Sequence, residues 1–183
     1  MTTSDAKSSA LHLDVEVFGA QHPAMNAQLL VEHARVALAK HGLSPRTMDF
    51  VVEREQKNGT VAFASPDPRS ASTLQEKLFT ELGAVVMAGL LLRARFGLQL
   101  TRATRCGSRV DYFVGRSPSA QEGVVEVKGR DAEAVETLAA RASDQLAQSI
   151  YVGPAFRLPG FVAVTRFRPQ AASLVRCEHP SSE

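Results

Sequence analysis

The chain has 183 residues, of which 44% are hydrophobic and 22% are charged. This length suits one domain that needs no disulfide or metal to fold, and this composition excludes a disordered or fibrous chain. The formal net charge of +2 hides an asymmetry: residues 1–92 hold 8 Lys and Arg against 10 Asp and Glu, whereas residues 93–183 hold 13 against 9.

The ends of the chain and its cysteines indicate a cytoplasmic protein. Residues 1–10 are small and polar, so we expect a disordered lead without the apolar core of a signal peptide. The longest apolar run, Leu82–Leu92, has eleven residues, fewer than the roughly 20 that span a bilayer. Cys106 and Cys177 have no CxxC spacing, which favours free thiols in a reducing compartment. We therefore expect a cytoplasmic protein with no membrane segment.

The first third of the chain predicts a β-α-β-β unit over residues 11–68. Residues 11–18 alternate apolar and polar side chains, which is typical of a half-buried strand. A helix is predicted over residues 23–40, before Gly42. Two strands, residues 48–55 and 60–64, follow, and Asn58-Gly59 predicts the tight turn between them.

A Pro- and Ser-rich linker at residues 65–72 separates this unit from a predicted core over residues 69–168. Ser72 and Gln75 have the spacing of a capping box, which predicts a helix from Thr73 to about Arg95. Strands and a second amphipathic helix follow, at residues 98–105, 109–114, 123–128, 131–150 (the helix) and 161–167. The order is α-β-β-β-α-β, and we expect a weakly structured tail over residues 169–183. The fold class is therefore α/β (α+β), with a central mixed sheet flanked by helices.

Three charged residues lie on strands where apolar side chains are otherwise expected. Glu126 and Lys128 point to one side of their strand, because strand side chains alternate, and Asp111 lies on the preceding strand. If these strands pair, the two carboxylates converge beside an ammonium group. Such an oxygen pair suits Mg²⁺ or Mn²⁺. Lys128 would then either orient an attacking water or offset the charge that grows on a phosphate.

The preceding helix offers a third carboxylate. At 100° per residue, Glu81 falls within the apolar stripe of Leu74, Leu78 and Val85, whereas Glu76 falls on the opposite side. Burying an unpaired charge is costly, so an acid on this stripe suggests a role. Glu81 is the better candidate.

The segment 93–130 holds 8 basic residues against 3 acidic ones. We expect some of its arginines to neutralise phosphates along a groove; the candidates are Arg102, Arg105, Arg109 and Arg130. Aromatic residues make up only 6% of the chain and Trp is absent, which counts against base stacking as a main mode of binding.

A helix acid, a strand carrying Asp, and an apolar strand carrying Glu-x-Lys together resemble the PD-(D/E)XK nuclease superfamily, the restriction-endonuclease-like fold. The resemblance covers residues 73–167, and the spacing is similar to that of archaeal Holliday-junction resolvases and related small nucleases. It implies Asp111 and Glu126 as ligands of Mg²⁺ or Mn²⁺, Lys128 as the catalytic lysine and Glu81 as an auxiliary acid.

The sequence departs from the pattern of that superfamily at two points. Val110 stands where the motif's name has proline, and Gln145 lacks the tyrosine four residues later that one branch carries, so Gln145 is a weaker auxiliary candidate. The expected activity is hydrolysis of phosphodiester bonds by a metal-dependent nuclease, in DNA rather than RNA.

Two simpler interpretations use the same residues. Glu126 and Lys128 also fit an exposed charge ladder, with Asp111 as a turn residue at the start of a strand. The chain as a whole also fits a non-catalytic binding or assembly module on a nuclease-like or other α/β scaffold. In that case residues 11–65 would form the surface for a second copy or a protein partner.

Overall fold

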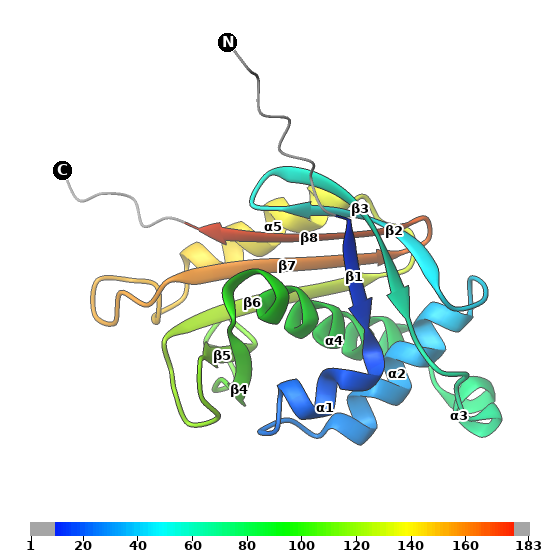
Figure 1. Ribbon diagram of the computed structural model, residues 1–183. Helices are drawn as coiled ribbons and strands as arrows, with labels where there is room; N and C mark the ends of the chain where they lie inside the picture. The colour runs from blue at the N-terminus through cyan, green and yellow to red at the C-terminus, as the bar shows by residue number, and fades with distance from the viewer. Residues whose placement is uncertain (1–9, 178–183) are drawn as a thin grey trace, which may run out of the picture.

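The computed structural model describes residues 10–177, which form one eight-stranded mixed sheet with helices on both faces (Figure 1). The predicted mixed α/β class is confirmed. The order of strands across the sheet is β1-β3-β2-β8-β7-β6-β5-β4. The strands are β1 (Leu11–Asp14), β2 (Arg46–Val52), β3 (Glu55–Ala62), β4 (Gln99–Ala103), β5 (Tyr112–Gly115), β6 (Gly123–Arg130), β7 (Gly160–Phe167) and β8 (Gln170–Cys177).

The helices divide the core into two layers. Helices α2 and α4 pack on one face of the sheet and α5 packs on the other. The helices are α1 (Phe18–Gln21), α2 (Ala27–Ala39), α3 (Pro68–Thr73), α4 (Glu76–Phe96) and α5 (Val135–Ala147). Within residues 10–177, no helix combines the length and the apolar character needed to cross a membrane.

The predicted order of elements after the linker is observed: α4, the strands β4, β5 and β6, then α5 and β7. The pairs β4–β5 and β5–β6 are antiparallel, whereas β6 and β7 are parallel. A parallel pair needs a crossover, and α5 supplies it. Helix α4 ends where Gly97 adopts a left-handed conformation, with φ of 68°, which glycine accommodates without a steric penalty.

The hairpin between β2 and β3 turns at a different place from the one predicted. Glu53 and Arg54 form the turn, both with positive φ, and Asn58-Gly59 lies inside β3. A Cβ on Gly59 would lie 2.0 Å from the carbonyl oxygen of Leu11. Glycine is therefore needed here for the close approach of β1 rather than for a turn.

Two boundaries near the N-terminal half also differ from the prediction. Strand β1 ends at Asp14, and residues 15–17 form a 3-10 turn that leads into α1. The predicted capping box is wrong, because Ser72 belongs to the short helix α3 and Gln75 caps α4 without a side-chain hydrogen bond. Asp67, whose side chain accepts from the N–H of Arg69, caps α3 instead.

The expected weak tail is wrong over residues 170–177, which form the central strand β8. This strand pairs with β7 on one side and β2 on the other, so it joins the N-terminal strands and the predicted core in one sheet. The segment lacks a clear alternating pattern because both of its faces are covered. The expected disorder of residues 1–10, apart from Ala10, lies outside the described residues, as do residues 178–183.

Candidate active site

Strand β6 carries Glu126 and Lys128 on the side of the sheet that faces α5. Val125 and Val127 belong to the core beneath α4, whereas Val124 belongs to the core beneath α5. Because side chains alternate along a strand, Glu126 and Lys128 share the face of Val124. The Glu126 side chain is fully buried, while 25% of the Lys128 side chain is exposed.

Asp111 lies directly before β5 and opposite Glu126. The register of β5 on β6 pairs Tyr112 with Val125, so one step back brings Asp111 across from Glu126. The backbone N–H of Asp111 donates to the carbonyl of Val125 (3.1 Å), and its Oδ2 accepts from the N–H of Val127 (2.8 Å). The Asp111 carboxylate therefore occupies the hydrogen-bonding edge that β6 presents beyond the end of β5.

A tight loop between β4 and β5 holds Asp111 in this position. Gly107 adopts a positive φ of 83°, and the Ser108 hydroxyl lies within hydrogen-bonding distance of the Val110 carbonyl (3.0 Å) and the Thr104 hydroxyl (2.8 Å). The backbone N–H of Thr104 donates to the carbonyl of Asp111 (2.9 Å). These bonds fix the backbone on both sides of the acid.

Burial dominates the electrostatics of the two acids. Removal from water raises the pKa of Glu126 to about 7, and the neighbouring Asp111 charge adds to this, whereas Lys128 opposes it. Burial also raises the pKa of Asp111 above its usual range, against the effects of the Val127 N–H and Lys128. Oε1 of Glu126 accepts from the Lys128 ammonium, but the buried Oε2 has no hydrogen-bond partner in the described part of the chain.

A cavity of about 280 Å³ lies between α4 and the free edge of β6. Asp111, Lys128 and Glu81 line it, while Glu126 is not among its lining residues. Tyr112, which the sequence analysis missed, also lines it, and burial followed by the Asp111 charge raises the pKa of its hydroxyl. The signal in the sequence that could have found Tyr112 is its position directly after Asp111. No described residue from 10–65 contributes to the lining.

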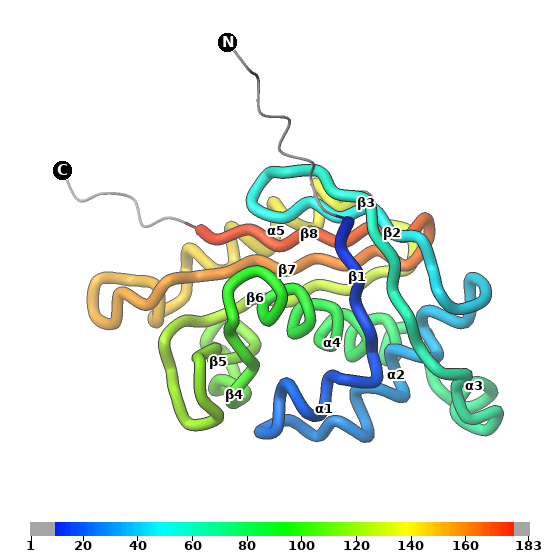
Figure 2. Tube along the Cα trace, in the orientation of Figure 1, coloured from blue at the N-terminus to red at the C-terminus, as the bar shows by residue number. Residues whose placement is uncertain are grey.

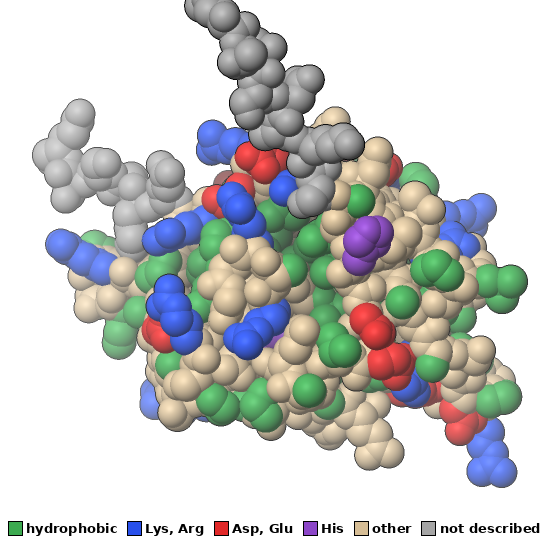
Figure 3. Space-filling model, viewed as in Figure 1, with side chains coloured by type: hydrophobic (Ala, Val, Ile, Leu, Met, Phe, Trp, Pro, Cys, Tyr) green, Lys and Arg blue, Asp and Glu red, His purple; other side chains and the backbone are tan. Residues whose placement is uncertain are grey.

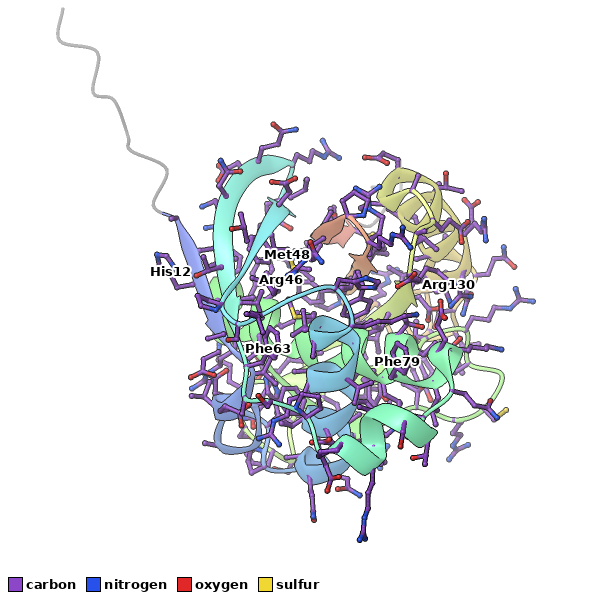
Figure 4. All side chains as sticks on the ribbon, turned by 90° about the vertical axis from the view of Figure 1, so that its right-hand side faces the viewer. His12, Arg46, Met48, Phe63, Phe79 and Arg130 are labelled. Atoms are coloured by element: carbon purple, nitrogen blue, oxygen red, sulfur yellow. The ribbon has the colours of Figure 1, made fainter. Side chains whose placement is uncertain are left out.

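Glu81 reaches the cavity but is engaged by a cation. Its Oε1 lies 3.2 Å from Nη1 of Arg130, and 42% of its side chain is exposed. Arg130 also approaches Glu133, at 4.0 Å. Figure 4 shows Arg130 on the same side of the molecule as Phe79 of α4, across from His12 of β1. Within residues 10–177, no group of three or more His, Cys, Asp or Glu side chains is arranged to hold a metal ion.

The remaining candidates lie around this centre. Arg102, Arg105 and Arg109 are exposed. Arg109 donates to Oε1 of Gln148 at the end of α5. Gln145 lies on α5 and is half-buried, and in the described part of the chain it makes no side-chain hydrogen bond to the acids.

Comparison of the chain with known protein families, with curated proteins and with solved structures finds no match.

Proposed function

We propose that this protein is a divalent-metal-dependent nuclease of the PD-(D/E)XK type, a hydrolase of phosphodiester bonds, with DNA as its favoured substrate. One observation carries the proposal. A fully buried carboxylate, Glu126, has one oxygen without a hydrogen-bond partner among residues 10–177, directly across from the second acid, Asp111. Buried polar groups are almost always paired, and strongly raised carboxyl pKa values cluster at functional sites.

The donor set fits Mg²⁺ or Mn²⁺. Both are hard cations that bind carboxylate oxygens and keep several water ligands, so one or two protein carboxylates are enough. Asp111 and Glu126 would hold the ion, and the unpartnered Oε2 of Glu126 is the atom that such a cation would satisfy. When bound, the ion would supply Lewis-acid activation of the phosphate and of a water.

The other side chains have separate tasks. Lys128 brings a partly exposed ammonium to the cavity wall, where it either orients the attacking water or offsets charge on the phosphate. The exposed guanidinium groups of Arg102, Arg105 and Arg109 would bind phosphates on either side. Arg130 would join them only after it releases Glu81, which would then serve as the auxiliary acid.

The arrangement of elements supports the same proposal. Helices α4 and α5 lie on opposite faces of the strands β4–β7, which pair in the order antiparallel, antiparallel and parallel. A mixed sheet between two helices, with the element order α-β-β-β-α-β, is what the resemblance to that superfamily implies. Asp111 and the Glu-x-Lys segment lie where β5 ends and β6 continues. A substrate backbone can approach a sheet at such a break.

A second candidate function is a non-catalytic binding or assembly module. It is favoured by the internal pairing of the charges: Lys128 binds Glu126, and Arg130 binds Glu81. Residues 11–65 would then provide the surface for a partner or a second copy. The two candidates predict different results for the same variants.

The test is cleavage of labelled linear, single-stranded and branched DNA, and of RNA, with Mg²⁺ or Mn²⁺. Asp111→Asn, Glu126→Gln and Lys128→Met should each lower the cleavage rate at least about a hundredfold, because each removes several kcal/mol of charge stabilisation. The chain contains a matched control: Glu55-Gln56-Lys57 repeats the Glu-x-Lys pattern at the start of β3, where 63% of the Glu55 side chain is exposed and neither charged residue lines the cavity. Glu55→Gln and Lys57→Met should cleave like the wild type.

Two outcomes contradict the nuclease proposal. One is the absence of cleavage of every substrate with either metal. The other is cleavage by Asp111→Asn and Glu126→Gln at the wild-type rate, which would indicate a contaminating nuclease. Either result favours the binding module.

A further inference from the structure

Three aromatic rings form a continuous line from β5, which begins directly after Asp111, to the surface. Phe113 lies two residues after Asp111 on β5, and its ring meets that of Tyr151 at a centroid distance of 4.8 Å. Tyr151 meets Phe156 at 5.5 Å. Burial decreases outwards along this line: Phe113 is 3% exposed and Tyr151 8%, whereas Phe156 is 57% exposed. The inner rings fix the outer one, which faces solvent.

Phe156 lies in the loop between α5 and β7, which projects beyond the end of the sheet (Figure 2). The same loop leaves Ile150 59% exposed. Tyr151 ties the loop down, because its carbonyl accepts from the N–H of Leu158 (2.9 Å). The anchored loop therefore presents two exposed apolar side chains, Phe156 and Ile150.

Three arginines adjoin this aromatic line, through a contact with one of its rings, through the start of the loop, or in sequence. The Arg102 guanidinium lies over the Phe113 ring at 5.3 Å, and Arg109 is joined to Gln148 at the start of the loop. Arg157, which follows Phe156 directly, is exposed. None of these three arginines forms an ion pair with a carboxylate in residues 10–177. Figure 3 shows more Lys and Arg over the left half of the molecule than over the right, with Asp and Glu at the top and lower right among them.

From this arrangement we propose that the protein binds a single-stranded segment of nucleic acid, with an unpaired base stacked on Phe156 and the flanking phosphates on Arg109 and Arg157. Aromatic platforms combined with basic side chains bind single strands because every base offers a flat face and every nucleotide carries a charge. The inference deepens the proposed function, since it makes a strand end, flap or other unpaired segment the substrate. A second copy of the chain is a poorer occupant because it would bring the same arginines against these.

The absence of Trp from the chain provides a direct probe. In Phe156→Trp the introduced indole is the only one, so a base that stacks on it quenches its fluorescence. Leu43, which is 90% exposed in the loop between α2 and β2, provides the control variant Leu43→Trp. With EDTA present to prevent cleavage, oligo(dT) should quench the Trp at position 156 and leave the Trp at position 43 unchanged.

Affinity measured by fluorescence anisotropy under the same conditions gives a second readout. Phe156→Ala should bind labelled oligo(dT) about five- to a hundredfold more weakly, with a much smaller change for a blunt duplex, and Phe156→Tyr should restore the wild-type value. Arg157→Gln should lower the slope of log K against log salt by about 0.7.

The proposal is overturned if Phe156→Ala binds oligo(dT) as tightly as the wild type, or if both introduced Trp residues are quenched equally. Sedimentation that changes from dimer to monomer in Phe156→Ala, with unchanged affinity for oligo(dT), would assign the surface to a second copy instead. If only the nuclease proposal is wrong, the protein will not cleave nucleic acid with metal but will still bind oligo(dT) in EDTA. The two proposals can therefore fail separately.

Discussion

Two clusters of acids and a cation occur in this molecule, and they are built in opposite ways. In the N-terminal part, Arg35 donates to both Glu16 (3.0 Å) and Glu32 (3.2 Å). The backbone N–H groups of Ala64 (3.0 Å) and Asp67 (2.7 Å) donate to the same two carboxylates. The hydrogen bond from Arg35 is the largest of the effects that hold the pKa of Glu16 below its usual range.

The second cluster, Asp111, Glu126 and Lys128, is short of donors. Burial raises the pKa of both acids, and no residue from 10 to 177 forms a hydrogen bond with Oε2 of Glu126. The first cluster joins α2 to the segment before α3 and has the geometry of a stabilising network. The second costs folding free energy, a cost that proteins retain where a site must bind something. The difference between the clusters is the one expected if the first is structural and the second is the site of the proposed function.

The largest expected effect is an opposite response of the two clusters to neutralisation. Glu126→Gln should raise the free energy of unfolding by about 1–3 kcal/mol, because a buried oxygen without a donor is replaced by an amide that can donate to Asp111. Arg35→Met should lower it by about 1 kcal/mol, as expected for a partly exposed network. Urea denaturation in EDTA measures both changes.

Cleavage assays of the same two variants complete this comparison. Arg35→Met should keep the wild-type cleavage rate, whereas Glu126→Gln should lose it. If Glu126→Gln unfolds at a lower urea concentration than the wild type, the buried Glu126 carboxylate stabilises the fold through its ion pair with Lys128. It would then resemble the acids of the N-terminal cluster.

Added Mg²⁺ should stabilise the protein through the second cluster alone. A ligand that binds only the folded state, at a concentration a hundred times its Kd, adds about 2.7 kcal/mol to the free energy of unfolding. Each kcal/mol raises Tm by about 2–4 °C for a chain of this size. Thermal unfolding should show this shift in the wild type and in Glu16→Gln, and no shift in Asp111→Asn. An equal shift in all three proteins would place the ion elsewhere.

The core elements were predictable because their causes are local. The alternation of β6, the apolar stripe of α4 and the stop at Gly97 all depend on residues within the element. The placement of Asp111 opposite Glu126 follows from two neighbouring strands with a short connection. For this reason the sequence was enough to nominate the acids and Lys128 as one group.

The features that were not predictable depend on distant partners. Gly59 resembles a turn residue until β1 is placed against it, and β8 resembles a tail until β2 and β7 cover both of its edges. The ion pair between Arg130 and Glu81 joins residues 49 positions apart. The line of rings to Phe156 requires the loop after α5 to return to β5. Neither the sequence distance nor the low aromatic content indicates this contact.

The smallest expected effect is the pH dependence of the N-terminal cluster. The pKa of Glu16 is lowered on folding, so below its ordinary value of 4.5 the unfolded chain binds a proton that the folded chain does not. Linkage then requires that the stability contributed by Glu16 is complete above pH 4.5 and is lost as pH falls through the folded-state pKa.

The wild type should therefore be more stable than Glu16→Gln at pH 7, and this advantage should shrink at pH 3. Urea midpoints at the two pH values, with Glu55→Gln as an exposed control, measure it. An advantage that stays constant with pH would show that Glu16 contributes through packing rather than charge, and the first cluster would then no longer serve as the electrostatic counterpart of the second.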